Sequence, residues 1–419
     1  MKLRLLILFI LLFAIDYYVF QGVRTLTRNL LPTTSKLIQT LYWSMTALFF
    51  VAIVVGILTM NPAEGPTPVF KKIFAVIALT YFTKLFFILF LFVEDISRLL
   101  LALFFYIKSW FITPSSPISF MPERRKFISQ AALLLVSVPF AALIYGITKG
   151  KYQFTVHRDT IFFDDLPQEF DGMTITQISD VHSGSFDSET DVLRGIKLIN
   201  EQNSDLFVFT GDLVNNTAQE MERWKPFFSQ IKKHPLGNFS ILGNHDYGDY
   251  IRWETPEAKK QNLNDLKTVH SQIGFRLLLN ENVPLTKSGA QINLMGIENW
   301  GLPPFPQYGD LQKATTNLKK DDFKILLSHD PSHWTAQVID FTKKVQLTLS
   351  GHTHGMQFGI EVPGFIKWSP VKYKYKNWAG LYQKANQYLY VNRGFGFLGF
   401  PGRVGIWPEV TVLTLRKKV

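Results

Sequence analysis

The sequence predicts an α/β fold in the C-terminal part of the chain, preceded by an α-helical transmembrane region. Two observations support this division. Long apolar runs with few charges fill residues 1–150, whereas after Gly150 short apolar runs alternate with longer polar, periodic stretches. The first pattern is typical of membrane-spanning helices, and the second of buried strands that alternate with helices. We therefore expect two domains, a polytopic transmembrane region at 1–150 and an α/β domain at 151–419.

Composition and charge narrow the class of protein further. Of the 419 residues, 47% are apolar and only 18% are charged, against roughly 25% charged in a soluble protein. Residues 1–150 hold 14 Lys and Arg against 5 Asp and Glu, and so carry +9 of the net charge of +11. Basic residues between apolar runs are typical of membrane loops, so a nucleic-acid partner is not expected. Because the chain has no Cys, disulfides, zinc–thiolate sites and thiol catalysis are excluded.

Four apolar runs are long enough to cross a bilayer, which takes about 20 residues. They are Leu3–Phe20, Leu37–Met60, Ile73–Val93 and Phe127–Ile147. The first run could instead be a cleaved signal peptide, but Asp16 interrupts it and no small-residue cleavage site precedes Arg24. Residues Ile96–Phe111 fit either a short fifth span or a helical extension along the interface, and we favour the extension.

The charges of the connecting loops predict an orientation. With four spans, the first and third loops share one side and hold eight Lys and Arg, against four on the other side. The positive-inside rule then places the C-terminal domain outside the cytoplasm. Arg124-Arg125-Lys126 before an apolar run also resembles a twin-arginine export signal. We slightly prefer to interpret these residues as the ordinary positively charged flank of a membrane span rather than as an export signal.

The second half contains the pattern of an α/β core. Three periodic stretches predict helices at Asp191–Gln202, Gln219–Lys233 and Glu257–Gly274. Short apolar runs predict strands at Thr174–Ile178, Leu206–Thr210, Phe239–Leu242, Ile292–Met295, Phe323–Leu327, Val345–Leu349, Tyr388–Val391 and Val410–Leu415.

Polar motifs directly follow five of these strands. In chain order they are Ser179-Asp180-Val181-His182, Gly211-Asp212, Gly243-Asn244-His245-Asp246, Ser328-His329-Asp330 and Gly351-His352-Thr353-His354. Ligand sites of α/β sheets gather beyond the carboxyl ends of the strands. We therefore expect these Asp, Asn and His side chains to converge into one polar cluster.

The donor types of this cluster favour a metal centre. Oxygen and nitrogen ligands without thiolates suit Mn, Fe or Zn ions. The one-residue spacing in Asp180-x-His182 and His352-x-His354 sends both side chains of each pair to the same side of an extended segment. A shared carboxylate can bridge two cations about 3.5–4 Å apart, and a bridging hydroxide can then attack phosphorus in line.

The ordered motifs resemble those of the calcineurin-like metallophosphoesterases. The family pattern is Asp-x-His, Gly-Asp-x-x, Gly-Asn-His-Asp/Glu, a lone His and Gly-His-x-His, and every element occurs in this order across Asp180–His354. The resemblance covers essentially all of 151–419. It implies a four-layer α/β/β/α sandwich and a hydrolase that acts on phosphate ester bonds.

The resemblance also implies a role for each motif residue. Two divalent metal ions, with Mn, Fe or Zn left open, are expected as cofactors. Asp180, His182 and His354 would hold one ion, Asn244, His329 and His352 the other, and Asp212 would bridge both. His245 would lie over the substrate, stabilise the transition state and protonate the leaving oxygen. Asp246 would orient His245.

Within this superfamily the chain looks most like a membrane-attached branch. That branch includes bacterial cell-wall-associated phosphoesterases with twin-arginine signals and enzymes that cleave UDP-2,3-diacylglucosamine. The similarity lies in Gly351–Gly355 followed by Gln357, in Tyr390–Gly396, and in Arg403 ahead of Pro408–Thr411. Met356 departs from the second Gly that such proteins usually have. We accordingly expect a multi-pass protein of the bacterial inner membrane, with its catalytic domain on the extracytoplasmic side.

Aromatic and basic residues alternate near the C-terminus. Lys367–Trp378 interleaves Lys with aromatic residues, and Phe395–Pro401 follows. Ordinary core and turn packing explains such stretches as well as a lip that docks on the bilayer, and both interpretations stay open. The candidate lip residues are Trp368, Phe397, Phe400 and Arg403.

The sequence therefore predicts a membrane-anchored, dinuclear-metal phosphohydrolase that cleaves a phosphoester or phosphodiester with a metal-bridging hydroxide. Its expected partners are the lipid bilayer and a phosphorylated substrate. Amphipathic phosphate esters are included among the candidate substrates. One alternative is a lipid-precursor pyrophosphatase acting on a UDP-diacylglucosamine-like substrate. Another, from a different class, is a non-catalytic membrane signalling or scaffold protein.

Overall fold

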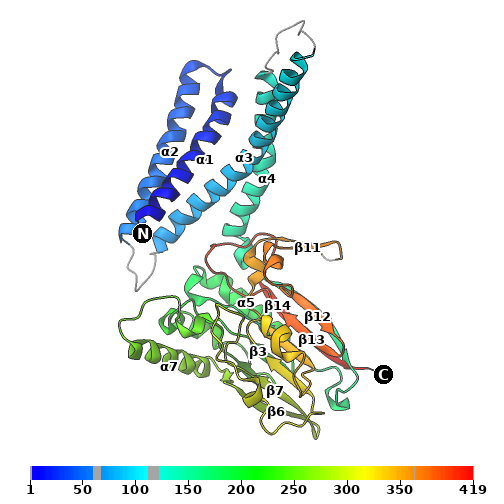
Figure 1. Ribbon diagram of the computed structural model, residues 1–419. Coiled ribbons are helices and arrows are strands. Elements are labelled where there is room, and N and C mark those ends of the chain that lie inside the picture. The colour runs from blue at the N-terminus through cyan, green and yellow to red at the C-terminus, as the bar shows by residue number, and fades with distance from the viewer. Residues whose placement is uncertain (1, 60–67, 112–121, 363, 419) are drawn as a thin grey trace. The chain divides into compact units, whose positions relative to one another are not determined.

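The chain divides into two compact units, Met1–Ile144 and Tyr145–Val419. The computed structural model describes residues 2–59, 68–111, 122–362 and 364–418 (Figure 1). The first unit is helical. Most of the second consists of strands, short helices and the loops between them.

Four helices of the described chain are long and apolar enough to cross a membrane. They are α1 Lys2–Thr27, α2 Pro32–Thr59, α3 Pro68–Ser109 and α4 Pro122–Thr148. This confirms the expected α-helical transmembrane region, and the protein is a membrane protein.

Helix α3 settles the alternative at Ile96–Phe111. It runs without a break over 42 residues from Pro68 to Ser109, so most of this segment extends the third span and is not a separate helix. At 1.5 Å per residue α3 is about 63 Å long, which exceeds the roughly 30 Å hydrocarbon core of a bilayer.

A polar cluster, here called the Asp16 cluster, lies among the first three helices. The Asp16 carboxylate on α1 is fully buried. It accepts hydrogen bonds from Tyr81 (2.6 Å), Thr46 (3.1 Å) and Tyr42 (3.1 Å), and it forms an ion pair with Lys84. Every partner comes from α2 or α3, so the residue that interrupts the first apolar run joins three helices.

The second unit is built on two six-stranded sheets. The first has the order β1-β14-β2-β3-β4-β5 and the second β12-β13-β9-β8-β7-β6, while β10 and β11 form a separate hairpin. The strands of the first sheet are β1 Thr155–Phe163, β2 Thr174–Ile178, β3 Leu206–Phe209, β4 Asn238–Ser240, β5 Arg276–Leu277 and β14 Glu409–Lys417. Those of the second are β6 Glu281–Lys287, β7 Ala290–Gly296, β8 Lys324–Leu327, β9 Leu347–Ser350, β12 Gly380–Lys384 and β13 Gln387–Val391. The hairpin consists of β10 Ile360–Val362 and β11 Ile366–Trp368.

The two sheets pack face to face and helices cover their outer faces, which gives four layers. One buried cluster joins Val208 of the first sheet to Ile325 of the second. Outside the first sheet lie α5 Glu189–Glu201, the short α6 Lys225–Phe228 and α7 Pro256–Gln272. Outside the second lie α8 Leu311–Ala314 and a π-helical turn at Trp334–Val338. The α/β/β/α sandwich expected from the resemblance is thus confirmed.

Parallel pairing sets the position of the site. Strands β2, β3 and β4 are parallel neighbours in the first sheet, and β7, β8 and β9 are parallel neighbours in the second. Their carboxyl ends therefore meet at the same edge of the sandwich.

Most elements expected from the sequence are present, and one is wrong. All eight expected strands occur, as β2, β3, β4, β7, β8, β9, β13 and β14. The expected helix Gln219–Lys233 is replaced by a short 3-10 helix at Ala218–Met221 and by α6. Pro226 explains the break, because its ring lacks an N–H and clashes with the preceding turn.

Candidate metal centre

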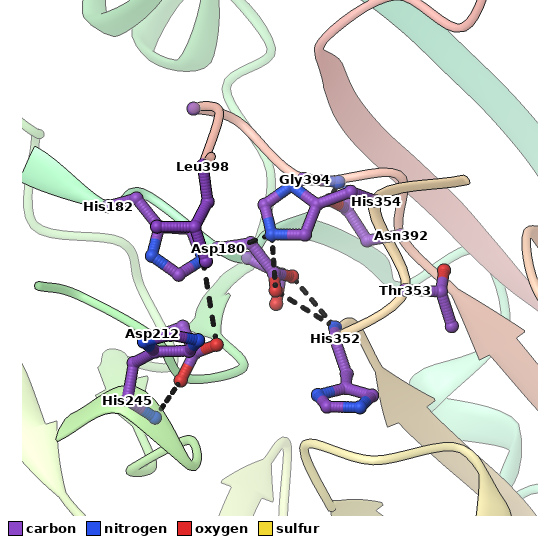
Figure 2. A network of polar contacts seen from close by, with 12 residues as sticks. Asp180, His182, Asp212, His245, His352, Thr353, His354, Asn392, Gly394 and Leu398 are labelled. Atoms are coloured by element: carbon purple, nitrogen blue, oxygen red, sulfur yellow. Dashed lines mark hydrogen bonds and ion pairs between the residues drawn. The ribbon is translucent and has the colours of Figure 1, made fainter. Parts of the chain in front are cut away.

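The five polar motifs lie at the carboxyl ends of β2, β3, β4, β8 and β9, and Figure 2 shows labelled residues of the first, second, third and fifth motifs close together. Two groups of side chains each bring their ligand atoms within 4.8 Å of one another. The first group is Asp180, His182 and His354, and the second is Asp212, His329 and His352. All six residues were candidate metal ligands in the sequence.

In the first group two histidine rings face each other above a carboxylate. The Nε2 atoms of His182 and His354 are 3.0 Å apart, and His354 Nε2 is 3.3 Å from Asp180 Oδ1. The Asp180 carboxylate also accepts the backbone N–H of His352, at 3.0 and 2.9 Å. This bond ties the end of β2 to the loop after β9, as Figure 2 shows.

In the second group Asp212 lies between histidines of both groups. Its Oδ2 is 3.2 Å from His329 Nε2 and 3.6 Å from His182 Nε2. The seventh candidate ligand, Asn244, places its Oδ1 2.7 Å from His352 Nδ1. One carboxylate thus faces both groups, and one amide oxygen lies beside the second.

The backbone of the site is held in an unusual conformation. Five of the six grouped residues have positive φ: Asp180 54°, His182 48°, Asp212 61°, His352 71° and His354 51°. Left-handed backbone is uncommon for residues other than Gly. Such strain persists only where the surrounding structure enforces it, and it concentrates at functional sites.

Two glycines permit this close approach of the loops. A Cβ at Gly243 would lie 2.2 Å from Asp212 Oδ1, and a Cβ at Gly351 would lie 2.2 Å from Asp180 Oδ2. A side chain at either position would displace a carboxylate of the site.

The electrostatics of the site favour a bound cation. Burial lowers the pKa of His182 to about 3 and that of His352 to about 4, and neutral imidazole is the form that binds metals. Burial also opposes the charge of His329, but the Asp212 carboxylate raises the pKa of His329 to about 10. In the absence of metal, the proton on His329 therefore compensates the negative charge of Asp212. A bound divalent ion would provide the same compensation.

The donor set fits such ions. Among the described residues, the buried His329 Nε2 lacks a hydrogen bond of good geometry, and the Nε2 atoms of His182 and His354 face each other at 3.0 Å. Buried polar atoms normally have partners, so these nitrogens, which face the cluster, indicate a missing ligand. Imidazole, carboxylate and amide donors in a thiol-free cluster suit divalent metals.

His245 lies beside the cluster, as expected of the residue assigned to the substrate. Its backbone N–H donates to Asp212 Oδ1 at 2.8 Å, and its ring centroid is 5.0 Å from that of His182. The ring Nδ1 lies 2.8 Å from the backbone carbonyl of Asn215. The ring also packs on Tyr250, with centroids 4.4 Å apart.

Asp246 is placed differently from the expectation that it orients His245. Its buried carboxylate accepts the backbone N–H groups of Gly243 (2.8 Å), Asp212 (2.9 Å), Leu213 (2.8 Å) and Val214 (3.3 Å). Among the described contacts, the His245 ring is held instead by the Asn215 carbonyl. Asp246 therefore fastens the loops after β3 and β4 to each other, and this role was not apparent from adjacency in the sequence.

Two of the four candidate lip residues are not at the surface. Phe397 is 3% exposed and packs on Tyr152 and Phe186. The Arg403 side chain is fully buried, donates to the Gly396 carbonyl and places Nη2 3.2 Å from His354 Nδ1. Trp368 and Phe400 are half-buried. Core packing thus accounts for Phe397, and Arg403 supports a candidate ligand from within the fold.

Two tyrosines at the site are not marked by any sequence motif. The Tyr375 hydroxyl lies 2.8 Å from His352 Nε2 and 3.4 Å from Asp330 Oδ2. The Tyr250 hydroxyl accepts a bond from Asn244 Nδ2 at 2.8 Å. Neither residue belongs to a motif, and only the Lys–aromatic stretch around Tyr375 marked that segment as unusual.

Comparison with known families agrees with this fold and site. Residues 3–151 match the model of a probable calcineurin-like phosphoesterase transmembrane domain, and residues 173–356 match that of the calcineurin-like phosphoesterases. The uncharacterized metallophosphoesterase YkuE of Bacillus subtilis is 33% identical over 254 residues, which are 60% of this chain and 82% of that protein. The chain therefore belongs to the calcineurin-like phosphoesterase family, and it is a membrane-associated phosphoester hydrolase.

Two further relatives illustrate the range of the family. The transmembrane protein with metallophosphoesterase domain of Danio rerio is 27% identical over 69% of this chain, which spans only 63% of that protein. The UDP-2,3-diacylglucosamine pyrophosphatase LpxG of Chlamydia trachomatis serovar D is 28% identical over 55% of this chain and 81% of that protein.

Proposed function

We propose that this protein hydrolyses a phosphoester or phosphodiester with two divalent metal ions held at the converging strand ends. Asp180, His182 and His354 hold one ion, and Asn244, His329 and His352 hold the other. Asp212 serves both. The observation that carries the proposal is the position of its carboxylate, which faces His329 at 3.2 Å and His182 at 3.6 Å.

When bound, such ions would polarise the phosphoryl group and supply a nucleophile from water at neutral pH. In the net reaction, water gives an oxygen to phosphorus, the ester P–O bond breaks, and a proton passes to the leaving oxygen. His245 is the group suited to that last transfer. Its Nδ1 donates to the Asn215 carbonyl, which fixes the ring so that Nε2 is the nitrogen that exchanges a proton with the substrate. Tyr250 packs on the ring and limits its rotation.

The side of the membrane is part of the proposal. The excess of Lys and Arg in the first and third loops supports an extracytoplasmic catalytic domain of a multi-pass inner-membrane protein. A second candidate function, cleavage of a UDP-diacylglucosamine-like pyrophosphate, is supported by the 28% identity to LpxG. Reporter fusions after Val419 separate the two candidates, because a nucleotide–lipid precursor on the cytoplasmic face would require a cytoplasmic domain.

The direct test uses the full chain, purified in nanodiscs and loaded with Mn²⁺. Its turnover of p-nitrophenyl phosphate and bis-p-nitrophenyl phosphate is compared with that of Asp212→Asn. The matched control is Asp164→Asn, an exposed carboxylate remote from the site. We expect metal-dependent release of p-nitrophenol by wild type and control only. Equal turnover by Asp212→Asn with full metal content would refute the proposal.

A further inference from the structure

The β10–β11 hairpin carries exposed apolar side chains. It stands outside both six-stranded sheets as a two-stranded element, and Figure 1 shows it at one end of the second unit. The side chain of Phe365 is 89% exposed, those of Ile360 and Val362 are about half exposed, and that of Ile366 is 38% exposed. Such a group of large apolar residues on a short hairpin marks an interaction surface.

The base of the hairpin is firmly held, so strands β10 and β11 have a fixed orientation within the second unit. Side chains alternate along β10, and Glu361 points opposite to its two apolar neighbours. Its carboxylate receives two hydrogen bonds from Arg393, at 2.8 and 2.6 Å, and Arg393 pairs in turn with the buried Glu409 at 2.6 Å. On β11, the Lys367 ammonium donates to the Ala379 carbonyl. The polar face is thus fastened inward and the apolar face turned outward.

Within the second unit, the hairpin adjoins the end of a membrane span. The backbone N–H of Gly359, just before β10, donates to the Val404 carbonyl at 2.9 Å. The neighbouring Arg403 N–H donates to the carbonyl of Gly146 at 3.1 Å. Gly146 lies in the last turn of α4, whose apolar span runs from Arg124 to Thr148. Within the second unit, the hairpin therefore lies close to the residues at which this span ends.

The hairpin is also connected to the candidate metal centre through Arg403, whose Nη2 lies 3.2 Å from His354 Nδ1 and whose neighbour Val404 is bonded to Gly359. It starts six residues after His354, and between them Met356 is 59% exposed. The rim on the His352 side is aromatic and basic. The Phe305 ring lies 4.7 Å from that of His352, and the Lys374 ammonium lies 5.1 Å from the Phe305 ring. An aromatic rim with a cation suits a substrate that has both an apolar body and a phosphate.

We propose that the tip of the β10–β11 hairpin inserts into the interfacial layer of the bilayer. The adjoining site then takes its substrate from that bilayer, as an amphipathic phosphate ester whose acyl chains stay among the lipids. Water cleaves the ester P–O bond, the leaving oxygen takes the proton, and the apolar product remains in the membrane. The substrate class rests on the proposed function, whereas the insertion does not.

Insertion can be measured without turnover, because the chain has no native Cys. An environment-sensitive fluorophore is attached to Phe365→Cys in vesicles of phosphatidylcholine and phosphatidylglycerol. The control label is on Asn386→Cys, in the exposed turn between β12 and β13. We expect a lipid-phase doxyl quencher to quench the Phe365 label and not the control, and aqueous iodide to do the reverse. Equal iodide quenching of both labels would overturn the proposal. Shielding of the Phe365 label from both quenchers would mean that a second copy of the chain covers the hairpin, which also overturns it.

The substrate class is tested with Phe365→Ser/Ile366→Ser, against Phe162→Ser as a control at an exposed aromatic residue of β1. We expect kcat/KM for a diacyl phosphate ester embedded in the vesicles to fall by about tenfold or more, and that for bis-p-nitrophenyl phosphate to stay within about twofold. Equal effects on both substrates, or none, would refute the bilayer as the source. If wild type turns over neither substrate, the proposed function fails, while the quenching result still decides insertion.

Discussion

Two of the buried polar clusters in the described part of the chain differ in how their atoms are satisfied. In the Asp16 cluster the carboxylate finds all its partners on neighbouring helices, three hydroxyl groups and one ammonium group. In the candidate metal centre His329 Nε2 lacks a good hydrogen bond, two Nε2 atoms face each other at 3.0 Å, and five residues have left-handed backbone. The first arrangement is complete within the protein, and we propose that bound metal completes the second.

This difference teaches how to separate structural from functional polar groups. A buried charge with a full set of partners holds elements in register, whereas strain combined with unpaired donors indicates chemistry. An ionisable residue within a membrane span is by default a functional candidate. The complete pairing of Asp16 argues instead for helix association.

The largest expected effect is on the metal centre. Replacing Asp212 by Asn removes the charge that serves both groups. Since losing a residue that only hydrogen-bonds to a metal ligand typically costs about 10–100-fold in activity, we expect a loss in kcat of about 1,000-fold or more. Steady-state kinetics of the purified full chain measure this. The helical unit should be unaffected, and retained turnover would show that Asp212 is not shared between two ions.

The corresponding change in the Asp16 cluster should act on stability. Asp16→Ala leaves Lys84 without its counter-charge, which costs about 3 kcal/mol or more for a buried pair. Asp16→Asn retains hydrogen-bonding capacity and is expected to cost less. Denaturant titration in mild detergent, followed by far-ultraviolet circular dichroism, measures both variants. An Asp16→Ala protein as stable as wild type, with reduced phosphoesterase turnover, would instead make the cluster functional.

His245→Ala sharpens the comparison within the metal centre itself. We expect metal content to be retained and kcat to fall about 100-fold, the lower part of the range for general acid–base catalysis. Tyr250→Phe is the milder companion, because it keeps the ring that packs on His245. A loss of metal that matches the loss of rate would show that His245 is a ligand.

The smallest effect concerns His270, a buried histidine outside the site. Both its ring nitrogens lack partners among the described residues, and burial alone lowers its pKa to about 3. Because the unfolded chain takes up this proton below pH 6.5 and the folded chain does not, stability falls as pH drops from 6.5 toward 3. The contribution is about 1.4 kcal/mol per pH unit.

His270→Phe should reduce the dependence of the free energy of unfolding on pH by the amount that one proton contributes. Denaturant titration at a series of pH values measures this dependence. An unchanged slope would contradict the assignment. The comparison also shows that an unpaired histidine is not by itself a metal ligand. His270 lacks the nearby carboxylates and the left-handed backbone of the site.

The sequence predicted the parts of the molecule that local patterns determine. The four apolar spans and the eight strands follow from runs of side chains, and the seven candidate ligands follow from motifs at strand ends. The contacts missed were set by long-range packing. These contacts depend on how loops meet in the folded chain. They are the contact of Asn215 with His245, the hydrogen bonds of Asp246 to the loops after β3 and β4, and the contact of Tyr375 with His352. The buried positions of Phe397 and Arg403 could not be separated from an exposed lip, since aromatic and basic residues occur in both settings.

The central claim is that one carboxylate organises two metal ions. The most direct measurement is the metal content of the purified full chain by inductively coupled plasma mass spectrometry, for wild type and Asp212→Asn. The account predicts two equivalents of divalent metal per chain in the wild type and a clear loss in the variant. Two equivalents in both proteins, or none in an active wild type, would contradict it.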